Sequence, residues 1–213
     1  MKNLSLLKII KQLFVGRPEG NPMDIAMDAF SSSQMGSKIW LVSKLEECLA
    51  GFAQRPDKGY RIWILAGWYG VTNLIIRTRH IIPVEHVHSI DCDPSCEPRA
   101  DRINKFWEWQ GWQFKAHTAD ANKLVYNRDN CPHIVINSSV EHFTSREWFD
   151  RIPKGTLVAM QACDLPHDSH VAAYACTEDL LREFQLSEFL YSGSLVFSYP
   201  EKDLTRFMVI GVK

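Results

Sequence analysis

A glycine turn follows the apolar run RIWILA and is the first point in the sequence where a ligand could be held. Gly67 and Gly70 permit a tight turn and a close approach of the backbone to that ligand. A helix expected from residue 71 would direct its free N–H groups at the same place. Trp68 and Tyr69 stand between the glycines, and neither the spacing G-x-G-x-x-G nor a phosphate-binding G-K-S/T is present. The turn therefore disfavours a dinucleotide or a triphosphate.

Acidic residues are expected at the ends of the next two strands. Asp91 ends the strand VHSID, where it is placed to hydrogen-bond both hydroxyls of a ribose. Asp93 competes for that role, but its position before Pro94 suits a helix N-cap. Asp120, in HTADANKL, either accepts a hydrogen bond from an exocyclic amine such as that of adenine or caps a turn. Together with the glycine turn, these acids indicate a nucleoside site without a phosphate grip.

A dense group of polar residues follows the β-branched run HIVI. Asn137, Ser138 and Ser139 come directly after it, and Glu141 and His142 come next. So many polar groups at the end of a strand are hard to place in a core, because each needs a partner. They either bond neighbouring backbone or line a site. In a site, the histidine would act as a base or orient the reacting group.

The segment QACDLPHDSHVAAYAC is expected to form the wall of an acceptor pocket. Cys163, His167, His170 and Cys176 are irregularly spaced and include no C-x-x-C pair, which is a poor match to a structural zinc site. We therefore predict no metal, and we expect both cysteines to act as small buried hydrophobes. Asp164 or one of the two histidines then meets the acceptor, and His170 is a second candidate for a catalytic base.

Strands and helices alternate along the part of the chain that must position these residues. Apolar residues at helical spacing run from about residue 31 to 52. Strand-like runs follow at 61–67, 87–91, 112–119, 133–139 and 156–162. Helical segments stand between or after them at 71–80, 94–110, 144–151 and from 177. Thr144 with Glu147 is expected to form a capping box. This order implies right-handed βαβ crossovers and a parallel sheet with helices on both faces.

Two further strands are predicted at 187–198 and 204–212, joined by the turn-prone YPEKD. They are expected to form a C-terminal antiparallel hairpin. We therefore predict a Rossmann-like α/β domain over residues 31–213, with a mostly parallel seven-stranded sheet. An N-terminal helical extension, residues 1–30, precedes it. Its segment MKNLSLLKIIKQLF is expected to form an amphipathic helix that packs on the domain or joins two subunits in a homo-oligomer, or that lies on a membrane surface.

The composition limits the partners and the compartment. A chain of 213 residues with 46% hydrophobic and 23% charged residues suits one globular domain. Its 24 Lys and Arg balance 25 Asp and Glu, so nucleic acid is disfavoured as a partner. No apolar run reaches the roughly 20 residues of a membrane-spanning helix. Six cysteines without a disulfide framework or a signal peptide predict a cytoplasmic protein.

The sequence resembles the class I S-adenosylmethionine (SAM) dependent methyltransferases over residues 31–213. The resemblance is carried by AGWYG, SIDCDP, HTADA, INSSVEHF and the final TRFMVIGVK. Three further stretches, SQMGSKIWL, IPKGTLV and LYSGSL, are similar to methyltransferase-like proteins of bacteria and phages. The resemblance implies SAM as cofactor and methyl transfer to a small-molecule or modest-sized acceptor. The alternatives are another SAM chemistry, by aminocarboxypropyl transfer or SAM cleavage, and a non-catalytic SAM-binding or partner-binding domain.

The resemblance also implies roles for residues at the matching positions. The turn from Gly67 to Gly70 would face the methionine part of SAM, with Trp68 or Tyr69 packing against SAM or shaping the acceptor pocket. Asp91 would bind the ribose, Asp120 and Ala121 would lie at the adenine, and Asn137, Ser138 and Ser139 would lie on the sulfonium side.

One departure from the family pattern concerns the residues before the turn. Leu65 and Ala66 stand where the family usually has an acid. In place of that acid, Lys38 and Ser37 could bind the carboxylate at the amino acid end of SAM. The alternative is that Lys38 is a solvated lysine on a helix face. His142 or His170 would be the base, oriented by Glu141.

Overall fold

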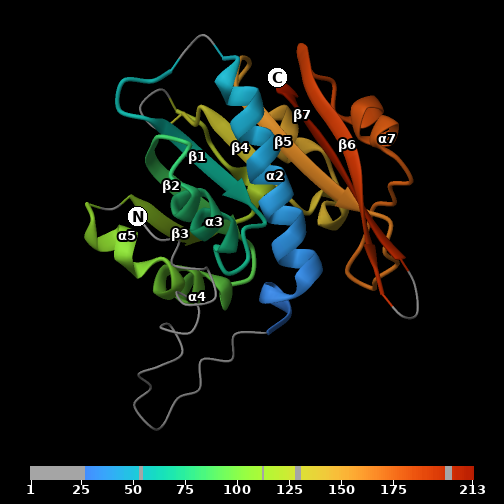
Figure 1. The fold of residues 1–213 in the computed structure, drawn as a ribbon, viewed down its shortest axis with the longest axis horizontal. Helices are drawn as coiled ribbons and strands as arrows, with labels where there is room; N and C mark the ends of the chain where they lie inside the picture. Colours follow the sequence, from blue (N-terminus) through green and yellow to red (C-terminus); the bar gives the residue numbers. More distant parts are fainter. Residues whose placement is uncertain (1–26, 53–54, 112, 128–130, 200–202) are drawn as a thin grey trace, which may run out of the picture.

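Seven strands form one sheet with helices on both faces in the computed structural model of the chain (Figure 1). The structure describes residues 27–52, 55–111, 113–127, 131–199 and 203–213. The strands are β1 (Tyr60–Leu65), β2 (Val84–Asp91), β3 (Phe114–Thr118), β4 (Ile134–Asn137), β5 (Leu157–Cys163), β6 (Glu188–Ser198) and β7 (Asp203–Val212). Their order across the sheet is β3-β2-β1-β4-β5-β7-β6.

The helices and 3-10 turns connect these strands in the expected alternation. They are η1 (Met27–Phe30), α2 (Ser32–Ala50), α3 (Val71–Arg79), α4 (Cys96–Ile103), α5 (Lys105–Trp109), η2 (Ala121–Lys123), η4 (Val140–His142), α6 (Glu147–Asp150) and α7 (Thr177–Glu183). Within the described residues, no helix is long and apolar enough to cross a membrane. Of the predicted N-terminal extension, only η1 falls within the described residues; its amphipathic segment and any contact it makes with a second subunit lie outside them.

Strands β1 to β5 pair in parallel, and β7 pairs antiparallel with both β5 and β6. The predicted Rossmann-like sheet with a C-terminal antiparallel hairpin is therefore confirmed. The chain order reverses between β1 and β4, because β2 and β3 lie on one side of β1 while β4 and β5 lie on the other. In open α/β sheets, this switch point opens a crevice at the carboxyl ends of the strands.

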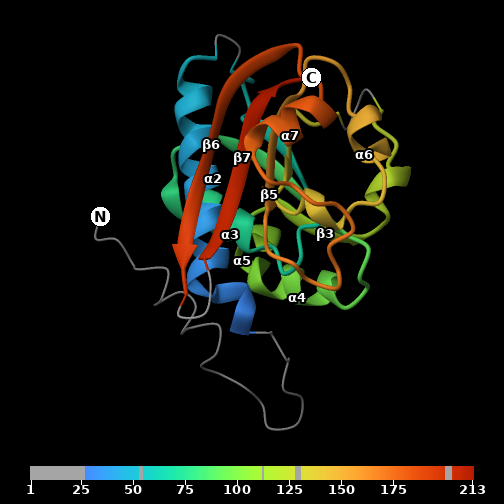
Figure 2. The same cartoon turned by 90° about the vertical axis from the view of Figure 1, so that its right-hand side faces the viewer.

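The sheet separates two hydrophobic cores, because successive residues of a strand point to opposite faces. In β1, Ile62 and Ile64 enter one core, and Trp63 and Leu65 enter the other. The first core is closed by α2, α3 and α4, and the second by α6 and α7. Figure 2 shows α2 and α3 on one side of the sheet and α6 and α7 on the other. Burial on both faces explains why the central strands read as continuous apolar runs.

The predicted helix over 94–110 is broken at Asn104, which is fully buried. Its side-chain nitrogen donates to the carbonyls of Ala100 and Gly70, and its oxygen accepts from Asn73. Gly70 has φ +70°, and a Cβ there would collide with the Asn104 side chain. Asn104 therefore joins the glycine turn to α4, and this long-range contact interrupts the helix.

Two of the expected helix starts are wrong. Helix α4 begins at Cys96 rather than Pro94, and Asp93 accepts a hydrogen bond from the backbone N–H of Ser95, the N-cap residue. Helix α6 begins at Glu147 without a side-chain cap, so Thr144 and Glu147 form no capping box. At α6 the backbone N–H of Trp148 donates to Asn122 of η2, a contact between distant segments that takes the place of the local cap.

Candidate functional site

Two adjoining cavities lie at the carboxyl ends of the parallel strands. Their volumes are about 440 Å³ and about 140 Å³. Both are lined by Ala66, which follows β1, by Asp91 and Cys92 at the end of β2, and by His142 after β4. The two cavities therefore share a wall at the switch point of the sheet, and together they are called the crevice.

Most of the residues predicted to form the site meet in this crevice. Those at the larger cavity are Lys38, Trp68, Asp91, Ser138, Ser139, Glu141, His142 and His170. Those at the smaller cavity are Asp91, Asp120, Ala121 and His142. Among the described residues that line either cavity, Gly67, Tyr69, Gly70 and Asn137 are absent. All four are buried.

The glycine turn is held in a strained conformation. Ala66 and Trp68 have φ of 48° and 47°, a left-handed region that side chains disfavour. Such residues cost about 1–3 kcal/mol each and persist where the surroundings hold them. The Trp68 backbone N–H donates to Asp91 Oδ2 at 2.8 Å, and the Trp68 ring stacks on Tyr69 with centroids 4.9 Å apart. Tyr69 is buried in the core, so Trp68 alone of this aromatic pair reaches the cavity.

Asp91 is the acid that faces the crevice at the end of β2. Its Oδ2 accepts from Trp68, and its Oδ1 accepts from the Asp93 backbone at 3.0 Å. Each carboxylate oxygen has two lone pairs, so both can accept a further hydrogen bond from a ligand. Asp93 is bonded to Ser95 and lines neither cavity in the described part of the chain.

Asp120 both caps a turn and lines the smaller cavity. Its Oδ1 accepts from the Asn122 backbone at 2.9 Å, and its other oxygen lies 3.2 Å from Lys123 Nζ. The Asn122 hydrogen bond is the main cause that lowers the pKa of Asp120, so the group is an anion at neutral pH. The two interpretations left open by the sequence, a cap and a ligand-facing acid, are therefore compatible.

Lys38 is carried into the larger cavity by α2. Its side chain is 7% exposed, and its Nζ donates to Gln34 Oε1 at 2.6 Å, one helical turn away. Gln34 lines the same cavity. This burial is not that of a solvated lysine on a helix face, which was the alternative interpretation. Ser37 instead donates to the Gln34 carbonyl and does not line either cavity among the described residues.

A buried ion pair forms the floor of the larger cavity. Glu141 is 1% exposed, and its Oε1 accepts from Arg206 Nη1 at 3.1 Å and from Cys163 Sγ at 3.2 Å. Burial raises the pKa of Cys163 to about 12, so the thiol keeps the proton that it donates. The sequence analysis does not identify Arg206. An arginine inside the apolar strand TRFMVIGV nevertheless indicates a buried acidic partner, because a buried charge must be paired.

The two histidines that are candidate bases are each held through one ring nitrogen. His142 Nδ1 lies 3.0 Å from the Ser169 carbonyl, and His170 Nδ1 lies 2.6 Å from the Leu165 carbonyl. Because a carbonyl only accepts, Nδ1 donates in both, which leaves Nε2 as the ring nitrogen that faces other partners. Burial of part of the His142 ring lowers its pKa, which favours its neutral form. The expectation that Glu141 orients a histidine is wrong, since these carbonyls do so.

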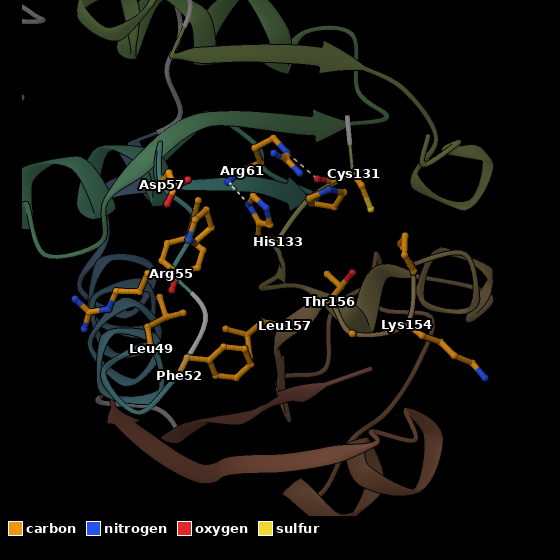
Figure 3. Close-up of a pocket in the computed structure, with 15 residues that line it drawn as sticks. Leu49, Phe52, Arg55, Asp57, Arg61, Cys131, His133, Lys154, Thr156 and Leu157 are labelled. Carbon is orange, nitrogen blue, oxygen red and sulfur yellow. Dashed lines mark hydrogen bonds between the residues drawn. The ribbon is translucent and has the colours of Figure 1, made fainter. Parts of the chain in front are cut away.

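A third cavity, of about 600 Å³, lies at the opposite end of the strands, beside the amino ends of β1 and β5 (Figure 3). The polar groups of Arg61 and His133 there already have partners: Arg61 N donates to His133 Nδ1, Arg61 Nε donates to the Cys131 carbonyl, and Arg61 Nη1 lies 3.5 Å from Glu85 Oε2. Figure 3 shows the Lys154 side chain directed away from the other labelled residues. Although this cavity is larger, the crevice at the carboxyl ends gathers the groups that could hold a ligand.

Solved structures were compared with the whole fold. The N-methyltransferase NodS from Bradyrhizobium japonicum, crystallised with S-adenosyl-L-homocysteine (SAH), aligns with a TM-score of 0.61 over 96% of this chain and 97% of its own, at 11% identity. Magnesium protoporphyrin IX methyltransferase (ChlM) from Synechocystis PCC 6803, with bound SAM, aligns with a TM-score of 0.56 over 98% and 92%, at 12% identity. The chain has a class I methyltransferase-like fold. No family model and no curated protein matches the sequence.

The class I methyltransferase-like fold was predictable from the strand-end motifs. At 11–12% identity, the likeness to NodS and ChlM concerns the arrangement of strands and helices. The chemistry of this chain must therefore be argued from its own crevice.

Proposed function

We propose that the chain is a SAM-dependent methyltransferase that acts on a small-molecule or modest-sized acceptor in the crevice. The observation that carries this proposal is the position of Asp91, which lines both cavities at the switch point. It divides a small cavity that contains Asp120 and Ala121 from a larger cavity that contains Trp68 and Lys38. NodS and ChlM, which share the fold, were crystallised with SAH and with SAM.

The proposal assigns each part of SAM to one part of the crevice. The adenine occupies the smaller cavity, where Asp120 accepts from its exocyclic amine. The ribose hydroxyls donate to Asp91. The methionine part extends into the larger cavity past Trp68, and Lys38 pairs with its carboxylate. Ser138 and Ser139 lie on the sulfonium side, above the buried Asn137.

The acceptor occupies the remainder of the larger cavity, whose volume of about 440 Å³ lies within the range of small-molecule sites, roughly 300–1,000 Å³. The oxygen or nitrogen of the acceptor attacks the methyl carbon in line with the bond to sulfur. That bond breaks and its electron pair stays on sulfur, so SAH leaves. The protein supplies alignment and a proton acceptor. His142 Nε2 takes the acceptor's proton, because His142 stands where the two cavities meet and its Nδ1 is already bonded to Ser169.

Product analysis tests this function and separates it from the other SAM chemistries. The full chain is incubated with SAM carrying an isotopic label in its methyl group and with a small-molecule extract, and the products are followed by mass spectrometry. We expect SAH together with a labelled small molecule. Methylthioadenosine as the main product would indicate aminocarboxypropyl transfer or SAM cleavage instead. Calorimetric binding of SAM without any turnover would indicate a non-catalytic SAM-binding domain.

A further inference from the structure

Three side chains of metal-binding type converge in the larger cavity. Glu141 comes from η4, Cys163 ends β5, and His170 belongs to the loop after β5. One donor atom of each, a carboxylate oxygen, a sulfur and a ring nitrogen, lies within 4.8 Å of the other two. In a tetrahedral zinc site with bonds of about 2.0–2.3 Å, neighbouring ligand atoms stand about 3.3–3.8 Å apart. Side-chain adjustments of about 1 Å would therefore bring the three atoms to bonding distance.

The carboxylate offers one oxygen that has no other use. Oε1 of Glu141 accepts from Arg206 and from Cys163, whereas Oε2 is buried without a hydrogen-bond partner among the described residues. Leaving a buried acceptor unsatisfied costs about 1–3 kcal/mol, and more for a charged group. A cation on Oε2 would satisfy this oxygen and would leave the ion pair with Arg206 in place.

The histidine is already oriented as a metal ligand. Metal-binding histidines almost always donate their other ring N–H to a carbonyl or a carboxylate, which fixes the tautomer. His170 Nδ1 makes such a bond to the Leu165 carbonyl at 2.6 Å, which leaves Nε2 as the ring nitrogen that can bind a metal. The loop that carries it is fastened to η4, because the backbone N–H groups of Val171 and Ala172 both donate to the Glu141 carbonyl.

We propose that Glu141, Cys163 and His170 bind a zinc ion, with a fourth coordination position open to the cavity. Thiolate and imidazole donors select zinc over magnesium or calcium, and three protein ligands with one open position are typical of catalytic zinc sites. Binding releases the Cys163 proton to solvent, so the thiolate and the Glu141 carboxylate offset the charge of the ion, and with Arg206 still paired to Glu141 the site keeps one net positive charge. The sequence analysis predicts no metal here, because it tests only the cysteines and histidines of the segment after β5. Glu141 lies outside that segment, and the fold brings it next to Cys163 and His170.

The zinc site extends the proposed function without being required by it. The open position faces the cavity that would hold the acceptor, where a bound hydroxyl would lose its proton more readily. His170 is then a ligand, and His142, whose ring lies 4.7 Å from that of His170, remains the proton acceptor.

Metal titration of the full chain in the absence of SAM tests the site. After treatment with a chelator, the protein is titrated with Zn²⁺ against a chromophoric competitor and, separately, with Co²⁺. We expect one zinc per chain and a sulfur-to-cobalt charge-transfer band. Cys163→Ser and His170→Asn each remove a direct ligand, so each should weaken zinc binding by at least about 100-fold, the upper end of what loss of a hydrogen-bonding partner of a ligand costs, and Cys163→Ser should abolish the band.

Matched controls come from a cysteine and a histidine outside the cluster. Cys176 is the N-cap residue of α7, and His80 is an exposed residue that ends α3. Cys176→Ser and His80→Asn should keep the stoichiometry and the affinity. The site is refuted if the wild type binds less than half an equivalent of zinc, if its cobalt form lacks the band, or if Cys176→Ser loses as much affinity as Cys163→Ser. Circular dichroism shows whether each variant is folded. If a variant is unfolded, the zinc stoichiometry and the cobalt spectrum of the wild type decide the question. Since SAM is absent, failure here leaves methyl transfer untouched.

Discussion

At the scale of single residues, Asp91 has two roles in the site. It holds the strained turn through the Trp68 backbone, and it lines both cavities. The sequence predicts the positions of Asp91, Asp120 and His142, because each follows a strand and strand ends meet at one edge of a parallel sheet. It does not predict the pairing of Glu141 with Arg206, which joins residues that are 65 positions apart in the chain.

Replacing Asp91 tests the ribose contact. Asp91→Asn should weaken SAM binding at least tenfold, since hydrogen bonds to a charged acceptor contribute about 1.5–3 kcal/mol. The measurement is calorimetric titration with SAM. Asp93→Asn is the matched control and should change the affinity by less than about twofold, because Asp93 bonds the start of α4. Equal losses in the two variants would argue against the assignment of the ribose to Asp91.

His142 is the proposed proton acceptor, and its loss should affect turnover rather than binding. His142→Gln should lower kcat by about 10²–10⁴-fold, the range typical of a general base, while the SAM affinity stays near that of the wild type. Turnover is measured by SAH release with the acceptor identified from labelled extract. His80→Gln, at an exposed position, serves as the control. An unchanged kcat in His142→Gln would remove His142 from the mechanism.

At the scale of elements, the site depends on the contact between the glycine turn and α4. The pattern CEPRADRINKFWEW favours one continuous helix, and the break at Asn104 follows from hydrogen bonds to Gly70 and Asn73. Such contacts between distant segments leave no periodic trace in the sequence. The mostly parallel sheet and its C-terminal hairpin, by contrast, follow from apolar runs and turn residues and are confirmed.

Gly70→Ala should destabilise the protein through this contact. The residue has φ +70°, and the added methyl would press on the Asn104 amide. We expect the free energy of unfolding to fall by about 2–4 kcal/mol, from the left-handed backbone and the displaced network together. Urea unfolding measures the change. Gly51→Ala, where φ is −86° and the nearest atom would lie 3.6 Å away, should cost less than about 1 kcal/mol. A loss in Gly70→Ala no larger than this would contradict the role of the contact.

The pairing of β2 with β3 gives the fold a dependence on pH. His88 Nδ1 lies 2.7 Å from His117 Nε2, beside Trp63 and His86. Burial, followed by His86 and His117, lowers the pKa of His88 to about 4. Because the unfolded chain takes up this proton near pH 6.5, the stabilisation is complete above pH 6.5 and falls as the pH drops towards 4. Between pH 7 and pH 5 the loss should be about 1–2 kcal/mol.

Urea unfolding at both pH values measures this loss, and His88→Leu should reduce it. The same variant leaves the crevice intact, because His88 lines neither cavity among the described residues. A pH dependence identical to that of the wild type would show that other groups cause it.

At the scale of the whole molecule, two cores hold a doubly covered sheet whose strand order reverses between β1 and β4. This reversal decides where a ligand crevice opens, and it explains why the polar residues after four separate strands meet there. The sequence was sufficient to predict the architecture, because each element carries its own pattern. The volume and division of the crevice depend on α2 and on the loop after β5, whose packing no local pattern reveals.

The central claim is that SAM binds at the carboxyl ends of the strands, and a crystal structure of the chain with SAH tests it most directly. We predict the adenine beside Asp120, the ribose hydroxyls on Asp91 and the homocysteine past Trp68 towards Lys38. SAH bound instead in the cavity at the amino ends of the strands, which Arg61 and His133 line, would contradict the account. A crevice that stays empty in crystals grown with millimolar SAH would contradict it as well.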